Sequence, residues 1–135
     1  MKEKNPYGLL FDEVKIGPVV APNRFYQVPH CTGMGYGSPN TLAAMREVKA
    51  EGGWGVVCTE YCSIHPSADE APYAVCSLWD DNDVHNLADM VERVHRHGAL
   101  AGVELWYGGN ATGNLLTREP SLAPSSVPTW SELSI

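Results

Sequence analysis

Polar or reactive side chains follow three apolar runs of this sequence, at the point where each run ends. The first run ends in Pro29-His30-Cys31, the second in Glu60-Tyr61-Cys62, and the third in Glu104-Leu105-Trp106-Tyr107. If these runs are parallel strands of an α/β sheet, their carboxyl ends meet at one edge, where such sheets bind ligands. The three endings therefore predict one shared ligand site.

Cys31 stands between an apolar run and a glycine-rich segment, and it has two open interpretations. A free cysteine usually acts as a small apolar side chain in a core. At a strand end it can instead present a reactive thiolate, when nearby positive charge favours the ionised form. His30 adjoins it in sequence, but consecutive strand residues point to opposite faces, so contact between these side chains is not expected.

Tyr61 and Glu104 also have two interpretations each. Tyr61 is either a half-buried aromatic whose hydroxyl reaches water, or a wall for a cationic or planar ligand. Glu104 lies within the apolar run VELW, where a carboxylate is rare without a partner. That partner would be an Arg or Lys in a structural ion pair, or the polar edge of a ligand.

The composition excludes several functional classes. The chain has 135 residues, of which 44% are hydrophobic and 19% charged, and its net charge is −7. These values fit a soluble globular protein and argue against nucleic-acid binding. No apolar run is long enough to cross a membrane and no secretory signal is present, so a cytoplasmic location is expected. The cysteines match no zinc-binding spacing, so no metal site is expected.

The elements that must position the three endings alternate between strands and helices. Strands are expected over residues 25–31, 54–61 and 100–107. One helix is expected from Pro39, with Ser38 as its N-cap, to the glycines at 52 and 53. The second is expected over residues 81–97, because acidic residues at its start and basic residues at its end complement the helix dipole. The expected apolar stripes of the two helices are Leu42, Met45 and Val48, and Val84, Leu87, Val91 and Val94.

This order of elements predicts a parallel sheet with right-handed crossovers. A β-hairpin is expected ahead of it, because Gly17 and Pro18 separate two β-rich pieces in VKIGPVVAPNRF. A closed eight-stranded barrel needs about 250 residues. Residues 1–135 are therefore expected to be the first part of a larger α/β protein, with residues 108–135 as a loop-rich tail. The glycines at 33, 35 and 37 do not follow the spacing G-x-G-x-x-G, which argues against a Rossmann nucleotide loop.

Three longer segments carry a family resemblance, namely NRFYQVPHC, VKAEGGWGVVCTEYCSIHP and GALAGVELWYGG. Together they resemble the N-terminal part of the trimethylamine dehydrogenase family, the amine dehydrogenases of the Old Yellow Enzyme superfamily. The resemblance runs from about residue 10 to residue 109. It implies that residues 1–135 are the N-terminal portion of an FMN-binding (β/α)8 TIM barrel with a leading β-hairpin.

The resemblance also implies roles for single residues. Cys31 matches the family cysteine that forms a thioether with carbon 6 of FMN, and Pro29 and His30 match the segment that lines the flavin. Tyr61 matches a tyrosine beside the flavin that holds a methylated ammonium group by cation–π attraction, which favours trimethylamine. Glu104 stands where reductase relatives have a glutamine that hydrogen-bonds the pyrimidine edge of the flavin.

The implied activity is oxidation of a small methylated amine by FMN to an iminium, which then hydrolyses. Dimethylamine and histamine remain possible substrates. The resemblance further implies a [4Fe–4S] cluster and an ADP site beyond residue 135, an electron-transfer flavoprotein as partner, and a homodimer. The chain alone is expected to be inactive and to expose sheet edges. Two alternatives remain open: an ene-reductase or dienoyl-CoA reductase-like flavoprotein, and a non-catalytic remnant that packs against a partner chain.

Overall fold

A computed structural model of the chain describes residues 5–68, 75–114 and 117–126. A 3-10 helix, η1 (Gly8–Phe11), precedes an antiparallel hairpin of β1 (Val14–Ile16) and β2 (Val19–Ala21). Gly17 has φ +57 at the turn, a conformation that favours glycine. The expected hairpin is therefore confirmed, whereas no sequence signal had indicated η1.

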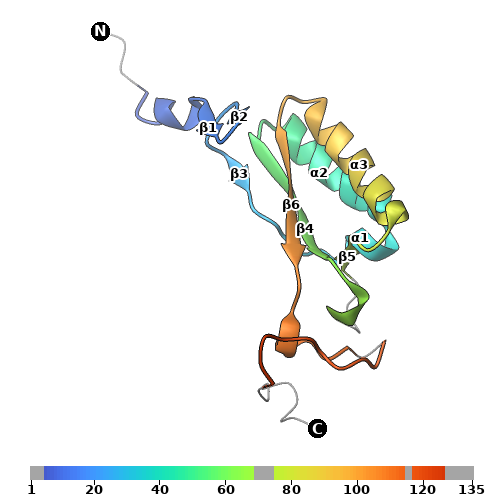
Figure 1. Ribbon diagram of the computed structural model, residues 1–135. Helices are drawn as coiled ribbons and strands as arrows, with labels where there is room; N and C mark the ends of the chain where they lie inside the picture. Colours follow the sequence, from blue (N-terminus) through green and yellow to red (C-terminus); the bar gives the residue numbers. More distant parts are fainter. Residues whose placement is uncertain (1–4, 69–74, 115–116, 127–135) are drawn as a thin grey trace.

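The main sheet has four parallel strands: β3 (Tyr26–Gln27), β4 (Val56–Ser63), β5 (Cys76–Ser77) and β6 (Leu100–Trp106). β4 is central, because β6 pairs along one of its edges while β3 and β5 pair with opposite ends of the other edge (Figure 1). The expected parallel order is confirmed. The first strand is much shorter than residues 25–31, and β5 was not expected.

Helices α2 (Pro39–Glu51) and α3 (Asp81–His95) lie side by side on one face of the sheet (Figure 1). Ser38 is the N-cap of α2, but its side chain makes no capping hydrogen bond. Asp80 caps α3 instead, because its carboxylate accepts from the backbone N–H groups of Asn82 and Asp83 at 2.8 and 3.1 Å. α3 ends two residues before the expected position 97. A short helix, α1 (Met34–Gly37), forms where a glycine loop was expected.

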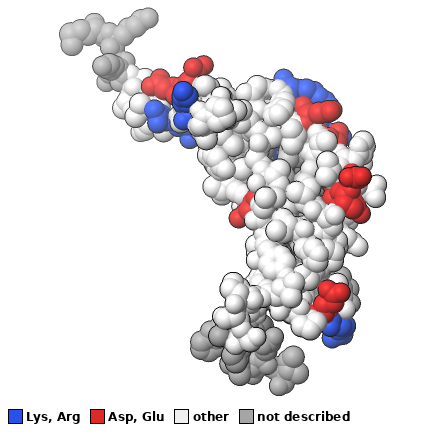
Figure 2. Space-filling model, in the orientation of Figure 1, with Lys and Arg blue, Asp and Glu red and all other residues white. Residues whose placement is uncertain are grey.

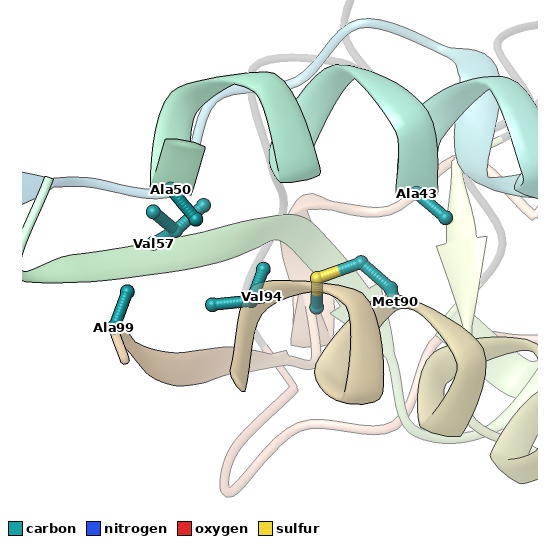
Figure 3. Packing of buried hydrophobic residues seen from close by; sticks show 6 residues of the cluster. All are labelled: Ala43, Ala50, Val57, Met90, Val94 and Ala99. Atoms are coloured by element: carbon teal, nitrogen blue, oxygen red, sulfur yellow. The ribbon is translucent and has the colours of Figure 1, made fainter. Parts of the chain in front are cut away.

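The helices pack on β4 through small and medium side chains, and the expected stripes are confirmed in part, since Leu42, Leu87 and Val94 are buried. The core cluster consists of Ala43, Ala50, Val57, Met90, Val94 and Ala99 (Figure 3). Val48 and Val84 are 64% and 54% exposed, so their assignment to the core was wrong. On both helices the buried stripe includes positions that the expected stripe omitted, Ala43 and Met90 among them, and the alanines let the backbones approach closely.

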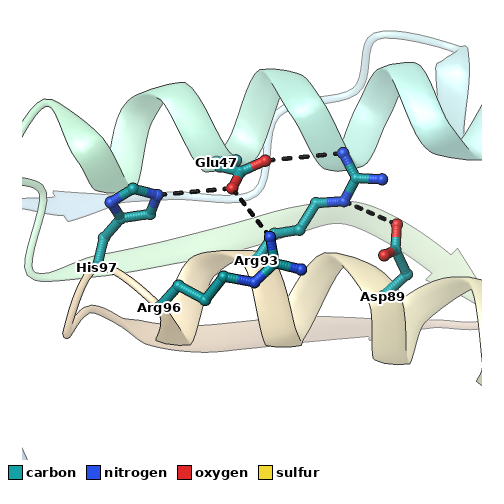
Figure 4. A network of polar contacts seen from close by, with 5 residues as sticks. All are labelled: Glu47, Asp89, Arg93, Arg96 and His97. Carbon is teal, nitrogen blue, oxygen red and sulfur yellow. Dashed lines mark ion pairs between the residues drawn. The ribbon is translucent and has the colours of Figure 1, made fainter.

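A network of ion pairs joins the outer surfaces of the two helices (Figure 4). The Glu47 carboxylate of α2 lies 3.6 Å from Arg93 Nη1, 3.5 Å from Arg96 Nη1 and 3.6 Å from His97 Nε2. Arg93 Nε also lies 2.9 Å from Asp89. The basic residues at the end of α3 thus contact a carboxylate of α2 in addition to complementing the helix dipole.

β4 and β6 differ sharply in burial. All residues of β4 are buried except the half-buried Tyr61, as expected for a strand covered on both faces. β6 was also expected to be buried, but Val103, Glu104 and Leu105 are exposed. The reason is that, in the described part of the chain, β6 pairs only with β4 and is an edge strand.

Among the described residues no helix has the length and apolar character needed to span a membrane.

A β-bulge in β4 reverses the alternation of its side chains. Cys58 pairs with Gly102 and Tyr61 pairs with Glu104, so β4 uses three residues where β6 uses two. Paired residues of a sheet share a face, and positions two apart on β6 do so as well. Tyr61 therefore lies on the same face as Cys58, opposite to the helices. Without the extra residue it would point toward α2 and α3.

Candidate functional site

The three segments named from the sequence lie next to one another at the carboxyl ends of the parallel strands. Tyr61 of β4 pairs directly with Glu104 of β6. On the other side of β4, the backbone N–H of Thr32 donates to the Glu60 carboxylate at 2.7 Å. Cys31 therefore lies level with the end of β4, which confirms that the topology brings the three endings together.

Cys31 is exposed, whereas Cys58, Cys62 and Cys76 are buried, and all four cysteines are free. The interpretation of Cys31 as a core side chain is thus excluded. The adjacent segment is accessible as well, since His30 is exposed and Pro29 is half-buried. The structure therefore presents a single accessible thiol at the candidate site.

Tyr61 forms an aromatic pair with Trp106 at the same end of the sheet. Their ring centroids are 5.2 Å apart and the rings are tilted by 43°. Sequence analysis did not single out Trp106 as a site residue. The signal was its spacing, because Trp106 lies two residues after Glu104 on a strand and so shares its face. The two rings and the carboxylate form one surface at the ends of β4 and β6.

Glu104 is exposed, so the argument that treated it as a buried charge was wrong. Its environment follows from the edge position of β6. Within the part of the chain that the structure describes, Glu104 forms no ion pair with Arg or Lys. The face of the molecule over the sheet carries few charged side chains, and most of those visible lie near the hairpin or along the helices (Figure 2).

The buried carboxylate of this region is Glu60, whose side chain was not assigned a role from the sequence. Glu60 is 0% exposed and accepts hydrogen bonds from the loop that follows Cys31. The signal was present in the run VVCTEY, where Glu60 is the one charged residue of a strand buried on both faces. Such a carboxylate requires several hydrogen-bond donors.

A second polar group borders the candidate site. The hydroxyl of Ser67 lies 2.8 Å from His65 Nδ1 and 2.9 Å from the Tyr107 hydroxyl. These residues line an open pocket of about 520 Å³, together with Leu122 and Pro124. Tyr107 directly follows Trp106, so this pocket adjoins the carboxyl end of β6.

Residues 108–114 and 117–126 are loop-rich, as expected, apart from η3 (Gly109–Ala111).

The buried cysteines differ from Cys31 in their chemistry. Cys62 and Cys76 are register partners on β4 and β5. A hydrogen bond between these two thiols and burial raise the pKa of Cys76 well above its ordinary value, and the same hydrogen bond lowers the pKa of Cys62. No group of three His, Cys, Asp or Glu side chains suited to a metal ion occurs among the described residues.

Comparisons with known proteins agree on one family. The family model of the NADH:flavin oxidoreductase / NADH oxidase family matches residues 9–131. The chain is 49% identical over 119 residues to dimethylamine dehydrogenase of Hyphomicrobium sp. (strain x), which covers 88% of the chain but 16% of that protein. The chain thus spans about one sixth of that relative.

Two solved structures are similar in both fold and sequence. Histamine dehydrogenase from Rhizobium sp. 4-9 superposes with a TM-score of 0.88 at 48% identity, over 93% of this chain and 19% of that one. The 6-hydroxypseudooxynicotine amine oxidase from Pseudomonas geniculata N1 gives a TM-score of 0.85 at 44% identity, over 92% and 19%. The strands and helices of this chain therefore match the N-terminal portion of a (β/α)8 barrel of this family.

Proposed function

The chain belongs to the NADH:flavin oxidoreductase / NADH oxidase family, and from that premise we propose that the whole protein binds FMN and oxidises a small amine. The observation that carries the proposal is the exposed thiol of Cys31 at the carboxyl ends of the strands, level with Tyr61 and Glu104. The similarity to proteins named as dimethylamine and histamine dehydrogenases supports an amine as substrate.

The residues of the site fit a flavin. Cys31 offers an accessible sulfur for a covalent bond to the ring, and Pro29 and His30 offer backbone groups beside it. Glu104 offers a carboxylate, free of Arg and Lys in the described residues, that can accept from a ring N–H. When bound, FMN supplies the acceptor for the two electrons that an amine loses as it becomes an iminium ion.

Tyr61 and Trp106 are suited to orient the substrate. Their rings lie 5.2 Å apart on the face opposite the helices. An aromatic face attracts an ammonium or methylated ammonium group by about 0.5–2 kcal/mol, depending on how far the cation is desolvated. We extend the proposal to a methylated amine such as trimethylamine, with dimethylamine and histamine as the competing substrates of the test.

For the whole protein, the proposal includes the remaining parts implied by the family resemblance. The electrons would pass to an iron–sulfur cluster and then to an electron-transfer flavoprotein, in a homodimer that also binds ADP. The described residues offer no such cluster site.

The decisive experiment analyses the purified whole protein by mass spectrometry after digestion. The peptide that contains Cys31 should carry the additional mass of FMN, and Cys31→Ala should bind FMN only noncovalently. Turnover is then compared for trimethylamine, dimethylamine and histamine. An active flavin-loaded protein with an unmodified Cys31 would contradict the covalent role. Turnover of enones with NADPH and of none of the amines would indicate an ene-reductase.

A further inference from the structure

We propose that Glu60 and Arg46 are positioning residues that fix the backbone on both sides of Cys31. Glu60 holds the segment after Cys31, and Arg46 holds the residue before it. The inference rests on the proposed function, because it gives these buried charges the task of placing the thiol that would hold the flavin. Neither residue reaches the surface, since both are 0% exposed.

The contacts of Glu60 enclose both of its carboxylate oxygens. Oε2 accepts from the backbone N–H of Thr32 at 2.7 Å, from that of Gly33 at 3.0 Å and from the Thr32 hydroxyl at 3.1 Å. Oε1 accepts from the backbone N–H of Gly35 at 2.7 Å. Hydrogen bonds to an ionised acceptor are about twice as strong as neutral ones. The four residues after Cys31 are thus folded around one side chain from β4.

Two glycines make this wrapping possible. Gly33 has φ +71, in the left-handed region that favours glycine. At Gly35 an added Cβ would lie 2.7 Å from the Cβ of Cys76 and would also collide with Glu60 Oε1. The glycines that follow Cys31 therefore serve the close approach of the loop to Glu60.

Arg46 acts on the other side of the thiol. Its Nη2 donates to the backbone carbonyl of His30 at 2.6 Å, which ties α2 to the residue before Cys31. Burial lowers the pKa of Arg46, and the negative charge of Glu60 is the largest influence that opposes this. A buried charge is costly when alone, and the negative charge of Glu60 favours the ionised form of Arg46. Together they hold His30 and Thr32, the residues on either side of Cys31.

Because of the bulge in β4, the neighbouring residues Glu60 and Tyr61 contact different parts of the site. Tyr61 takes the face of Cys58 and reaches Trp106, whereas Glu60, one residue earlier, reaches the loop after Cys31. A regular strand would place Tyr61 on the face of the helices. Glu60 and Tyr61 are consecutive residues of β4. This segment of β4 therefore determines where the Cys31 thiol lies relative to the pair of Tyr61 and Trp106.

The test compares Glu60→Gln with a matched control, Glu51→Gln, in the whole protein. Glu51 is exposed and lies at the end of α2. Glutamine at position 60 retains the shape but lacks the charge, and its amide group would face backbone donors. In flavin-free protein, hydrogen exchange of the peptide 31–37 should accelerate at least about tenfold in Glu60→Gln and stay unchanged in Glu51→Gln.

A second measurement follows the fraction of Cys31 that carries FMN after reconstitution. Glu60→Gln should still bind FMN noncovalently but should lose most of the covalent fraction, because the thiol is no longer held in one place. Arg46→Lys, which retains the charge but not the planar donor group, should give an intermediate loss. Glu60→Asp, with the charge on a shorter stem, should restore part of the covalent fraction.

The outcomes separate this inference from the proposed function. If wild-type protein never carries FMN at Cys31 although exchange accelerates in Glu60→Gln, the covalent role of Cys31 in the proposed function fails, while the positioning of the loop by Glu60 stands. If exchange and the covalent fraction match wild type in Glu60→Gln, the positioning role is overturned. Should Glu60→Gln not fold, Glu60→Asp provides the exchange measurement, and wild-type protection of Gly35 in it would overturn the inference.

Discussion

Tyr61 of β4 and Glu104 of β6 are register partners, and a bulge one residue earlier places both on the face opposite the helices. A carboxylate and an aromatic ring are thus presented together at the carboxyl end of the sheet, with Trp106 packed against the ring at 5.2 Å. This relationship depends on one extra residue in β4. Because of this extra residue, β4, which is otherwise buried, presents Tyr61 as one wall of the candidate site.

Removal of the Tyr61 ring should weaken binding of a cationic amine. Tyr61→Leu removes the cation–π contribution of about 0.5–2 kcal/mol and should raise KM by roughly 2–30-fold. Tyr61→Phe retains the ring and should stay within about threefold of wild type. Steady-state kinetics of the whole protein measure the effect, with Tyr7→Leu at the exposed N-terminal segment as control. An equal KM for all four proteins would exclude Tyr61 from substrate binding.

Cys31 should be the first cysteine to react with iodoacetamide in native, flavin-free protein. Its thiol is exposed, while the other three are buried and Cys76 is further disfavoured because its raised pKa keeps it protonated. Peptide mass spectrometry at short reaction times should find one modified site. Prior alkylation should then prevent covalent flavin attachment. Modification of Cys58 or Cys62 before Cys31 would contradict the structure.

The ion pairs between α2 and α3 should contribute modestly to stability. Glu47→Gln removes contacts to Arg93, Arg96 and His97, and should lower the free energy of unfolding by about 0.5–1 kcal/mol at low salt. The difference from wild type should shrink in high salt, because salt screens partly exposed charges. Urea unfolding at two salt concentrations measures this, and Glu51→Gln at the exposed end of α2 is the control. A salt-independent loss would show that packing rather than charge is affected.

The alternation of strands and helices was predictable because its signals are local. β4 is a continuous apolar run, and α3 begins at the acidic residues expected there, of which Asp80 is its N-cap. The hairpin follows from Gly17 at a turn that needs positive φ. Burial of β6 was not predictable in this way, since VELW has the composition of an inner strand and its exposure depends on which strands pair with it.

The site was predictable as a place but only partly as a set of contacts. The ends of the strands follow from the apolar runs and from the parallel order, and they predicted that Cys31, Tyr61 and Glu104 lie close together. The bulge was not visible in the sequence, because it is a register difference between two strands. Without it, neither the orientation of Tyr61 nor the contacts of Glu60 could be derived, and the buried carboxylate was sought at Glu104 instead.

Gly35 provides the sharpest test of the packing behind Cys31. An added Cβ would collide with Glu60 Oε1 and with the Cβ and Cα of Cys76, so Gly35→Ala should lower the free energy of unfolding by about 1–3 kcal/mol. Gly37 lies in the same short helix α1, where an added Cβ would meet nothing within 4 Å and the backbone has no positive φ. Gly37→Ala should therefore be neutral, or stabilising by up to about 1 kcal/mol. Urea unfolding of the two variants gives the comparison, and equal stabilities would show that the loop does not lie against β4 as described.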